Sequence, residues 1–455
     1  TSYSETNVQE RGVDEGDLVK TDGAYIYLAR GTHFFVLKAN PAVETALVSD
    51  TDLREPINEL YLANNLVTVI TTSYSYPVMT GFAGSVASSR SGPVTRLYTY
   101  DVSTAATPTL TASIDFPGTL RGSRRINTDI YLIINHTIDI PSPVSLWDYL
   151  NPGSFYDRDA YMRAREQALA ENLKRIEEAT LDDLLPAYTV TLSTAGTPSA
   201  SPAISYDGIY IPEFGNGTDL SLVVRLDIAG PVPLIAATSG VLSSWCSVYM
   251  SPESLYLTSD NHWWWIEPMV GVDMPPANAE PRTAVHKFSV AGPEGNPLYK
   301  GSAEVDGWVN DRFSMSDYQG QLRIGTTRGG WWGEGISNQL AVLSEGDGKL
   351  VEVGKLTGLA QGERIYSMRF DRDRGYMVTF RRTDPLFTLD LRDPANPQVA
   401  GELVVSGFST YIHLLGTDRL LTIGRSADDF GRVTGNKLQL FDVSNLAAPA
   451  LLEEL

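Results

Sequence analysis

The chain has few of the residues that build disulfide-linked, metal-binding or membrane-spanning proteins. It has one cysteine in 455 residues, so it can form no internal disulfide and no paired-thiol metal or redox site. That cysteine, Cys246, lies in an apolar stretch and is expected to be buried. No run approaches the ~20 apolar residues of a membrane helix. The sequence starts at Thr1 without a signal peptide, so we expect either a cytosolic protein or a mature form after processing.

Positive charge is also scarce. Lysine and arginine number 35 against 55 aspartates and glutamates, which gives a net charge of −20. A protein with this net negative charge repels phosphate backbones and anionic membranes. Nucleic acid is therefore not an expected partner. The histidines form no HExxH pair, and no nucleophile elbow, phosphate loop or dinucleotide fingerprint stands in a suitable context. The sequence therefore predicts no cofactor and does not favour an enzyme.

Turn-forming residues are abundant, and they punctuate an internal repeat. The 39 glycines and 26 prolines favour an all-β protein over a helical bundle. Three segments align without gaps, each with an apolar strand that ends in Asp and a Pro seven residues later: residues 97–108, 386–397 and 438–449. The Asp side chain can accept bonds from turn amides, and the Pro suits the start of an edge strand.

A second recurring element, a turn followed by a short alternating strand, precedes the first and occurs seven times. Uninterrupted copies are about 42–44 residues apart, close to the ~40–50 of propeller blades. The sequence therefore predicts one β-propeller domain over residues 1–455, with seven four-stranded blades. The expected blades are residues 16–50, 57–113, 120–240, 241–304, 306–356, 362–405 and 408–455.

The long insertions all fall between the second and third strands of their blades. They cover residues 73–93, 136–219, 260–282, 328–337 and 425–435, and in a ring of meanders they emerge on one face. Such a face usually binds a partner, although the insertions could be tolerated decoration. The insertion at 136–219 in blade 3 holds a predicted helix at about 159–179. Its apolar stripe favours a flap packed over blade 3, and a partner-binding helix is the alternative.

Two insertions in neighbouring blades are rich in tryptophan. They carry Trp263, Trp264, Trp265, Trp331 and Trp332. Adjacent residues of a strand point to opposite faces, so at least one ring of each set should lie near solvent or a partner. Exposed aromatics suit stacking on sugar rings or protein hot spots, whereas the alternative is a local cluster of the two loops.

Several stretches resemble one family along nearly the whole chain. Residues 6–23 resemble the opening of secreted bacterial and archaeal proteins that contain a C-terminal β-propeller domain distantly related to WD40 repeats. Further matching stretches are residues 120–125, 249–256, 312–318, 362–369, 384–390 and 407–413. The resemblance implies export, through a signal or lipoprotein segment upstream of Thr1, and implies no reaction. Family members continue beyond the equivalent of Leu455, so a ring of eight or more blades is the alternative.

Charged residues near the predicted inner strands suggest a channel mouth. Asp14, Glu15 and Asp17 could hold Ca²⁺, although no loop matches the DxDxDG pattern. The favoured interpretation pairs these carboxylates with arginines at interblade positions: Arg121, Arg124, Arg125 and Arg364. His413, beside Tyr411, is the candidate for general acid–base work with Asp14 or Asp317, and a buried hydrogen-bond network is the alternative.

Three functional classes follow from these observations. The preferred one is an extracytoplasmic binding or assembly scaffold, secreted or in the cell envelope, whose Trp-rich face docks a protein or glycan. The alternatives are an enzyme with a cation-assisted hydrolase or lyase site at the channel mouth, and a structural subunit of an envelope or extracellular assembly. Convergence of Asp14, Asp17 and His413 without arginine partners would favour the enzyme.

Overall fold

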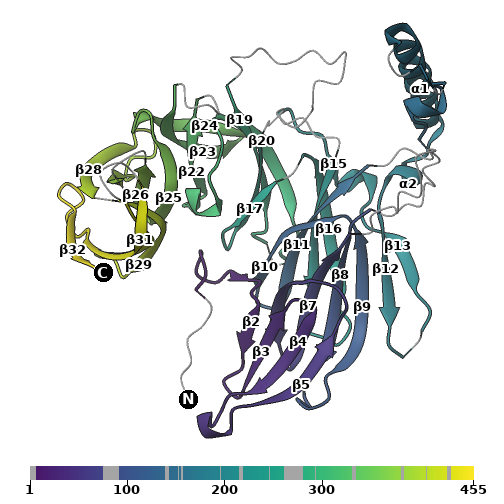
Figure 1. Ribbon diagram of the computed structural model, residues 1–455, viewed down its shortest axis with the longest axis horizontal. Coiled ribbons are helices and arrows are strands. Elements are labelled where there is room, and N and C mark those ends of the chain that lie inside the picture. Colours follow the sequence, from purple (N-terminus) through teal and green to yellow (C-terminus); the bar gives the residue numbers. More distant parts are fainter. Residues whose placement is uncertain are drawn as a thin grey trace. The chain divides into compact units, whose positions relative to one another are not determined.

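The computed structural model describes most of the chain, in two compact units (Figure 1). The described residues are 7–74, 92–138, 143–151, 153–154, 157–194, 196–214, 219–244, 246–260, 280–292, 294–329, 335–380, 384–405, 407–427 and 432–455. Unit 1 comprises Thr1–Val8, Asp14–Tyr210 and Gly217–Leu242, and unit 2 comprises Gln9–Val13, Ile211–Asn216 and Ser243–Leu455. Each unit is described by itself.

Unit 1 contains three antiparallel meanders. The first is β2 (Val19–Thr21), β3 (Tyr25–Arg30), β4 (His33–Lys38) and β5 (Ala46–Asp52). The second is β6 (Ile57–Ala63), β7 (Leu66–Ser73), β8 (Val94–Asp101) and β9 (Thr109–Pro117). The third is β10 (Thr119–Ile126), β11 (Asp129–Thr137), β15 (Asp219–Asp227) and β16 (Leu234–Leu242).

Short strands extend two of these sheets to six strands each. Strand β1 (Asp14–Glu15) pairs with β10, and β14 (Ile209–Tyr210) runs parallel to β16. Strands β12 (Ala187–Leu192) and β13 (Ser199–Pro202) form a hairpin that pairs with β9. The insertion of the third sheet therefore also completes the outer edge of the second.

Unit 2 contains four sheets of four strands. They are β17 (Ser247–Met250), β18 (Ser254–Asp260), β19 (Arg282–Ser289) and β20 (Leu298–Asp306), then β21 (Met315–Tyr318), β22 (Gln321–Arg328), β23 (Ser337–Gly346) and β24 (Lys349–Leu359). They continue with β25 (Arg364–Asp371), β26 (Arg374–Phe380), β27 (Asp384–Asp390) and β28 (Gln398–Val405), then β29 (Phe408–Leu415), β30 (Arg419–Ala427), β31 (Val433–Asp442) and β32 (Ala450–Glu454).

Helices are few in the described part of the chain. The α-helices are α1 (Arg158–Glu178) and α2 (Leu181–Leu184), and the 3-10 helices are η1 (Ala42–Glu44), η2 (Leu146–Asp148), η3 (Tyr206–Gly208) and η5 (Arg312–Ser314). No helix among the described residues has the length and apolar character needed to cross a bilayer. The predicted all-β class is confirmed.

Within each unit, consecutive sheets share a hydrophobic core. One cluster joins the first two sheets of unit 1, through side chains such as Phe34 and Val69, and another joins the second and third. In unit 2, three clusters join the four sheets in the same successive way. Since a four-stranded meander cannot bury both faces alone, this stacking is what propeller blades require.

The Asp-ended repeat forms the turn that its residues predict. Asp101, Asp390 and Asp442 end the third strands β8, β27 and β31, and each carboxylate accepts a bond from the backbone amide two residues later, at 2.8–3.1 Å. These bonds stabilise the ionised carboxylate: the pKa of Asp101 is lowered by the side chain and amide of Ser103. The fourth strands begin one residue after the repeated prolines.

Helix α1 differs from the expected flap. It begins at Arg158 with the side chain of Asp157 capping two amides, close to the predicted start. Its buried residues, however, are Ala164 and Ala168, while Leu169 and Leu173 are exposed. The parts of the insertion that pack over the sheets are instead β12 to β14, with Ile204 and Tyr188 at the core. The apolar stripe of α1 was therefore wrongly assigned to the core.

Candidate functional site

The tryptophan-bearing insertions of unit 2 leave the same end of two adjacent sheets. We call this the insertion end: second strands β18 and β22 end there, third strands β19 and β23 begin there, and the chain crosses there to the next sheet. Trp263, Trp264, Trp265, Trp331 and Trp332 themselves lie outside the described residues. The residues on which the two insertions are anchored are described, and they form one polar network.

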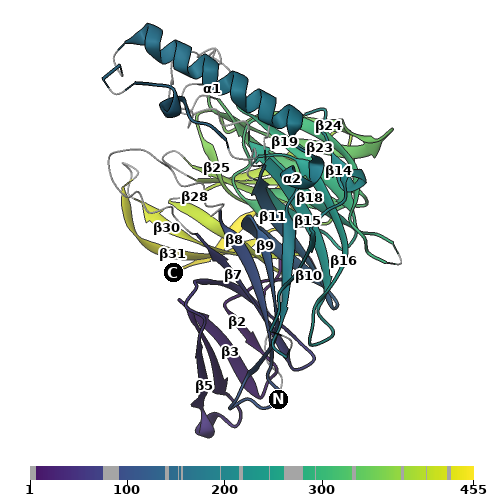
Figure 2. The ribbon, with the colours of Figure 1, turned by 90° about the vertical axis from the view of Figure 1, so that its right-hand side faces the viewer.

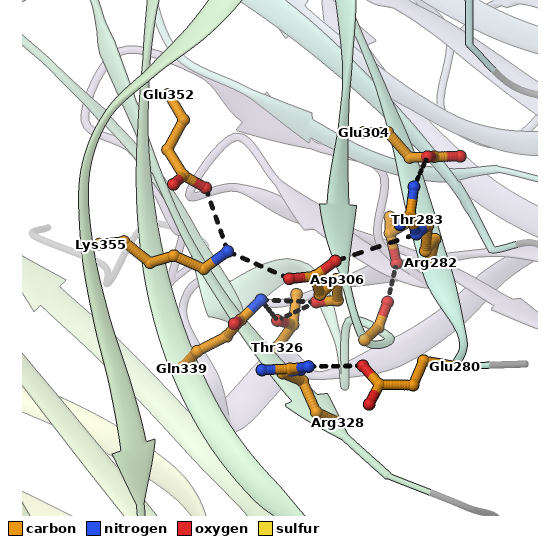
Figure 3. A network of polar contacts seen from close by, with 11 residues as sticks. Glu280, Arg282, Thr283, Glu304, Asp306, Thr326, Arg328, Gln339, Glu352 and Lys355 are labelled. Carbon is orange, nitrogen blue, oxygen red and sulfur yellow. Dashed lines mark hydrogen bonds and ion pairs between the residues drawn. The ribbon is translucent and has the colours of Figure 1, made fainter. Parts of the chain in front are cut away.

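Asp306, at the end of β20, is the centre of this network (Figure 3). One carboxylate oxygen lies 3.1 Å from Lys355 Nζ in β24 and the other lies 3.9 Å from Arg282 Nε in β19. The Asp306 carbonyl accepts hydrogen bonds from Thr326 Oγ1 and Gln339 Nε2, both at 2.7 Å. An ion pair and two hydrogen bonds to a backbone carbonyl thus join the first sheet of unit 2 to the second.

The ends of the network hold the insertions. Arg328, the last residue of β22, lies 2.5 Å from the carboxylate of Glu280, just before β19. At the same end of the sheet, the hydroxyl of Thr283 donates a hydrogen bond to the carboxylate of Asp260, the last residue of β18, at 2.7 Å. Figure 3 shows Glu280 and Arg328 converging from the two sheets. The attachment points of the two tryptophan-bearing insertions are therefore in direct contact.

The electrostatics of the network hold Asp306 ionised. Partial burial acts to raise its pKa, but the hydrogen bond and charge of Lys355, with the charges of Arg328 and Arg282, outweigh burial and lower the pKa. Lys355 also lies 3.4 Å from Glu352, and Arg282 lies 2.7 Å from Glu304. Four carboxylates of this network, those of Glu280, Glu304, Asp306 and Glu352, are paired with lysine or arginine, which suits a base for loops rather than acid–base chemistry.

Aromatic side chains stand at the insertion end of the remaining sheets of unit 2. Tyr366, Phe380 and Phe408, which we call the aromatic trio, are half-buried, with ring centroids 4.6–5.6 Å apart. Nearby in the chain, the guanidinium of Arg364 lies 5.7 Å from the ring centroid of half-buried Trp308. Trp308 pairs with Thr327, one residue before Arg328. Aromatic and arginine side chains therefore follow the Glu280–Arg328 contact along the insertion end of unit 2.

The predicted acidic cluster lies in unit 1 and is paired with cations. Asp14 lies 2.8 Å from both Lys20 and Arg125, and Glu15 lies 3.8 Å from Arg124. Asp17 accepts a bond from the amide of Leu18. Such paired carboxylates fit a Ca²⁺ ion poorly, and no group of three or more metal-ligating side chains occurs in the described part of the chain. The pairing itself is the structural interpretation favoured from the sequence.

The predicted common mouth of arginines needs correction. Arg124 and Arg125 face Tyr131 and Ile130, beside the turn between β10 and β11, which is the end opposite the insertion. Arg121 lies nearer the insertion end of the same strand. Arg364 begins β25 in unit 2, opposite Phe380. The sequence repeat did not reveal the four-residue separation of Arg121 and Arg125 along β10.

The described contacts of His413 are aromatic, and those of Asp317 are hydrogen bonds within unit 2. His413 lies half-buried in β29, stacked on Tyr411 with centroids 6.3 Å apart. Asp14 belongs to the other unit. Asp317 Oδ2 accepts a hydrogen bond from Tyr256 at 3.0 Å and lies 3.3 Å from Ser251 Oγ. Tyr411 contacts Phe313 edge-on, at 5.8 Å, so this region is built as an aromatic network.

One buried polar cluster in unit 2 was missed by the sequence reasoning. Glu10 accepts a hydrogen bond from Tyr249 at 2.8 Å, and the Tyr249 oxygen accepts from the amide of Asp317 at 2.6 Å. Buried Arg323 and Arg369 lie over aromatic rings beside it. Most of these residues lie in the stretches that carry the family resemblance, which was the available signal.

The cleft at the opposite, turn end of unit 2 is small. It measures about 180 Å³ and is lined by residues that include Tyr318, Arg323, Asp373 and Arg392. Pockets for drug-sized ligands are typically about 300–1,000 Å³. This cleft is therefore not a strong candidate for a ligand pocket.

Comparison with known proteins agrees with the arrangement of stacked meanders. A family model described as a beta propeller domain matches residues 3–455. The chain belongs to this beta propeller domain family. The match covers both units, so the sheets of unit 1 and unit 2 are parts of one family domain in sequence.

Two archaeal relatives match nearly all of this chain. An uncharacterized protein of Methanocaldococcus jannaschii is 27% identical over 482 residues, which cover 98% of this chain and 68% of the relative. An uncharacterized protein of Archaeoglobus fulgidus is 27% identical over 500 residues, which cover 98% of this chain and 70% of the relative. A crystal structure of a functionally unknown protein from Desulfotomaculum acetoxidans matches 59% of this chain and 76% of its own, with 10% identity and a TM-score of 0.33.

Proposed function

We propose that the chain is a propeller scaffold that docks a protein partner through the insertion end of unit 2. The observation that carries this proposal is the ion pair between Glu280 and Arg328, which joins the roots of the two tryptophan-bearing insertions. The loops then begin from one rigid base and can present their rings to the same partner. Trp, Tyr and Arg dominate protein hot spots, and all three gather here.

The aromatic trio and the Arg364–Trp308 contact extend this surface across the following sheets. Half-buried rings held by one another lose little conformational entropy when a partner covers them, which makes them suitable anchors. A glycan would use the same rings by stacking, and it is the second candidate ligand. The presence of arginine beside the rings favours a protein.

The proposal includes a seven-bladed ring and a location outside the cytoplasm. The described residues form seven sheets, and the cores shared by successive sheets within each unit support blades. Export, with a lipid anchor upstream of the chain, rests on the family resemblance. Cell fractionation with an antibody against the chain tests the location: recovery in the cytosolic fraction alone would contradict it.

The enzyme alternative has less support. It required Asp14 and Asp17 to converge with His413 without arginine partners, but Asp14 is paired with Arg125 and Lys20. A Ca²⁺ site at these residues stays a prediction that calcium titration by calorimetry can test. A role as a structural subunit of an envelope assembly is compatible with the docking proposal, because such a subunit also needs a partner surface.

The docking proposal is tested by quantitative capture from the envelope fraction of the source organism. The bait is the whole chain, compared with a variant in which Trp263, Trp264, Trp265, Trp331 and Trp332 are serine. A variant with Tyr74 and Tyr76 changed to serine, in the first insertion of unit 1, is the matched control. We expect one protein to be enriched by the wild type and the control and lost from the tryptophan variant.

Two outcomes would contradict docking of a protein. Equal recovery by all three baits would show that the tryptophans carry no binding. Binding to a glycan array that disappears only in the tryptophan variant, without an enriched protein, would assign the same surface to a carbohydrate.

A further inference from the structure

Helix α1 contacts η2 and Val144 of its own insertion, and its buried side chains are small. Ala164 and Ala168 are its buried residues, and Asn172 makes two bonds of 2.8 Å, donating to the carbonyl and accepting from the amide of Val144. The residues just after Val144 form η2, which α1 contacts. This anchoring fixes which side of α1 faces η2 and Val144; Figure 2 shows the helix along its length.

The side that faces away carries the large apolar side chains. Leu169, Leu173 and Ile176 are 55%, 51% and 41% exposed, and Met162 is half-buried. Their spacings of seven, four and three residues are those of a coiled-coil seam, with Met162, Leu169 and Ile176 at d and Leu173 at a. Single exposed apolar residues are common on proteins, but a row along one helix face marks an interaction site.

The charges beside the seam favour one occupant. In the first eight residues of α1, three arginines and one aspartate give a net charge of +2, and in the remaining thirteen, four glutamates against one lysine and one arginine give −2. A helix with opposite charge on its two halves is complementary to a copy of itself that runs antiparallel. We propose that the protein self-associates through antiparallel pairing of α1 from two copies.

The heptad positions sharpen this orientation. In an antiparallel pair centred near residue 170, the flanking position e of one helix faces e of the other, so Arg163 meets Glu177 of the second copy, twice by symmetry. Both side chains are exposed in the single chain. A parallel pair would instead place Glu166 against Glu166 at a, where like charges repel. The sequence of α1 therefore specifies the antiparallel arrangement.

The expected dimer is weak. Helix α1 has 21 residues and is about 31 Å long, so a single helix pair buries less than the ~1,200–2,000 Å² of stable protein interfaces. We expect a dissociation constant on the order of 10 μM, which becomes functional where the protein is concentrated or held at a surface. A dimer carries two propellers, so it would bind a partner with repeated sites more tightly than a single chain does.

Sedimentation velocity of the whole chain, from low to high micromolar concentration, tests the proposal. We expect a reversible monomer–dimer equilibrium for the wild type and a monomer at all concentrations for the double variant Leu169→Glu/Leu173→Glu. Both leucines are exposed, so the substitutions leave the fold intact, which circular dichroism and the melting temperature check.

Charge exchange tests the orientation. Arg163→Glu and Glu177→Arg should each raise the dissociation constant about tenfold, and an equimolar mixture of the two should restore dimers because each repelling contact becomes attractive. In a parallel pair these positions are about 21 Å apart, so mixing would restore nothing. Glu178→Arg, the neighbouring residue on the far side of the helix, is the matched control and should dimerise like the wild type.

Three results would overturn the proposal. One is a wild-type monomer throughout the concentration range. Another is a dimer that Leu169→Glu/Leu173→Glu leaves unchanged. The third is sedimentation of the wild type, but not of this variant, with phosphatidylcholine vesicles in the absence of a dimer, which would assign the seam to a lipid surface.

Discussion

Residues of the N-terminal segment contact the first strand of a meander in each unit, and their carboxylates have different partners in the two units. In unit 1, Asp14 and Glu15 of β1 lie beside Arg125 and Arg124 of β10 as ion pairs. In unit 2, Glu10 lies against Tyr249 of β17 and accepts its hydroxyl hydrogen bond. The carboxylates of one segment thus form ion pairs in unit 1, at Asp14 and Glu15, and accept a hydrogen bond from a neutral hydroxyl in unit 2, at Glu10.

The difference follows from burial. Burial raises the pKa of Glu10, although the Tyr249 hydrogen bond and the charges of Arg369 and Arg323 act in the opposite direction. Both arginines donate hydrogen bonds to other groups: Arg323 donates to Ser316 Oγ at 2.6 Å, and Arg369 donates to the carbonyl of Gln9 at 3.2 Å. Burial therefore favours the neutral form of Glu10 in unit 2, whereas the ion pairs of Asp14 and Glu15 in unit 1 depend on ionisation.

His286 gives the largest expected effect in this comparison. It is buried in β19 of unit 2, and burial lowers its pKa to about 4 from the ordinary value of 6.5. The unfolded chain binds the proton first as the pH falls, so stability is lost between pH 6.5 and about 4. We expect His286 to contribute a loss of about 3 kcal/mol by pH 4.

The measurement is hydrogen exchange of β18 and β19 peptides at a series of pH values, corrected for the intrinsic rate. His286→Leu is the control, because it removes the titration and fills a similar volume, and its protection should depend less on pH. If the two proteins lose protection in parallel, His286 is not the group that makes unit 2 acid-sensitive.

Tyr249→Phe should have the next largest effect. The substitution removes the donor to Glu10 and the acceptor of the Asp317 amide while it keeps the ring. Two buried polar groups lose a partner, so we expect a loss of about 2 kcal/mol in the free energy of unfolding of unit 2. Protection against exchange should fall in β17 and β21 and stay unchanged in β10 and β11. Equal loss in both units would contradict separate polar clusters.

The fold was largely readable from the sequence because its signals are local. An Asp that accepts amides of its own turn, as Asp101 and Asp442 do, requires no knowledge of distant residues. Strand alternation and blade-length spacing are similarly local. Helix α1 was misassigned because an apolar stripe does not show what it packs against: Ala164 and Ala168 are buried, whereas Leu169 and Leu173 of the stripe are exposed.

The candidate site was less predictable because it depends on register and on contacts between sheets. The tryptophans were identified from composition, but nothing in the sequence relates Glu280 to Arg328, which are 48 residues apart. Likewise, Glu10 reaches Tyr249 across 239 residues. Ion pairs of Asp14 and Glu15 were anticipated by charge alone, while the position of Arg125 along β10 needed the strand pairing.

Arg125→Met tests the ionic side of the comparison and should cost about 1 kcal/mol. The methionine keeps part of the apolar stem but removes the guanidinium, which lies 5.7 Å from the ring centroid of Tyr61. Asp14 then loses one of two cations, and the carbonyl of Leu62 loses a donor. The pair is partly exposed, so the loss should shrink as salt concentration rises. Chemical denaturation at low and high salt, followed by exchange in β10, measures it. A loss independent of salt would show that packing and not charge is removed.

Glu10→Gln is the smallest expected effect and the sharpest test of the buried side. Because the folded-state pKa of Glu10 is raised, the acid favours folding below its unfolded value of 4.5, and that contribution is lost as the pH rises through the folded pKa. The amide cannot ionise and can still accept from Tyr249, so the variant should be slightly more stable than the wild type at neutral pH and indistinguishable from it in acid. Aspartate and arginine neighbours are unchanged, so the pH dependence of the difference isolates this carboxyl. A variant that is less stable at neutral pH would mean that Glu10 acts as a charged partner of Arg369 and Arg323, and unit 2 would then follow the same rule as unit 1.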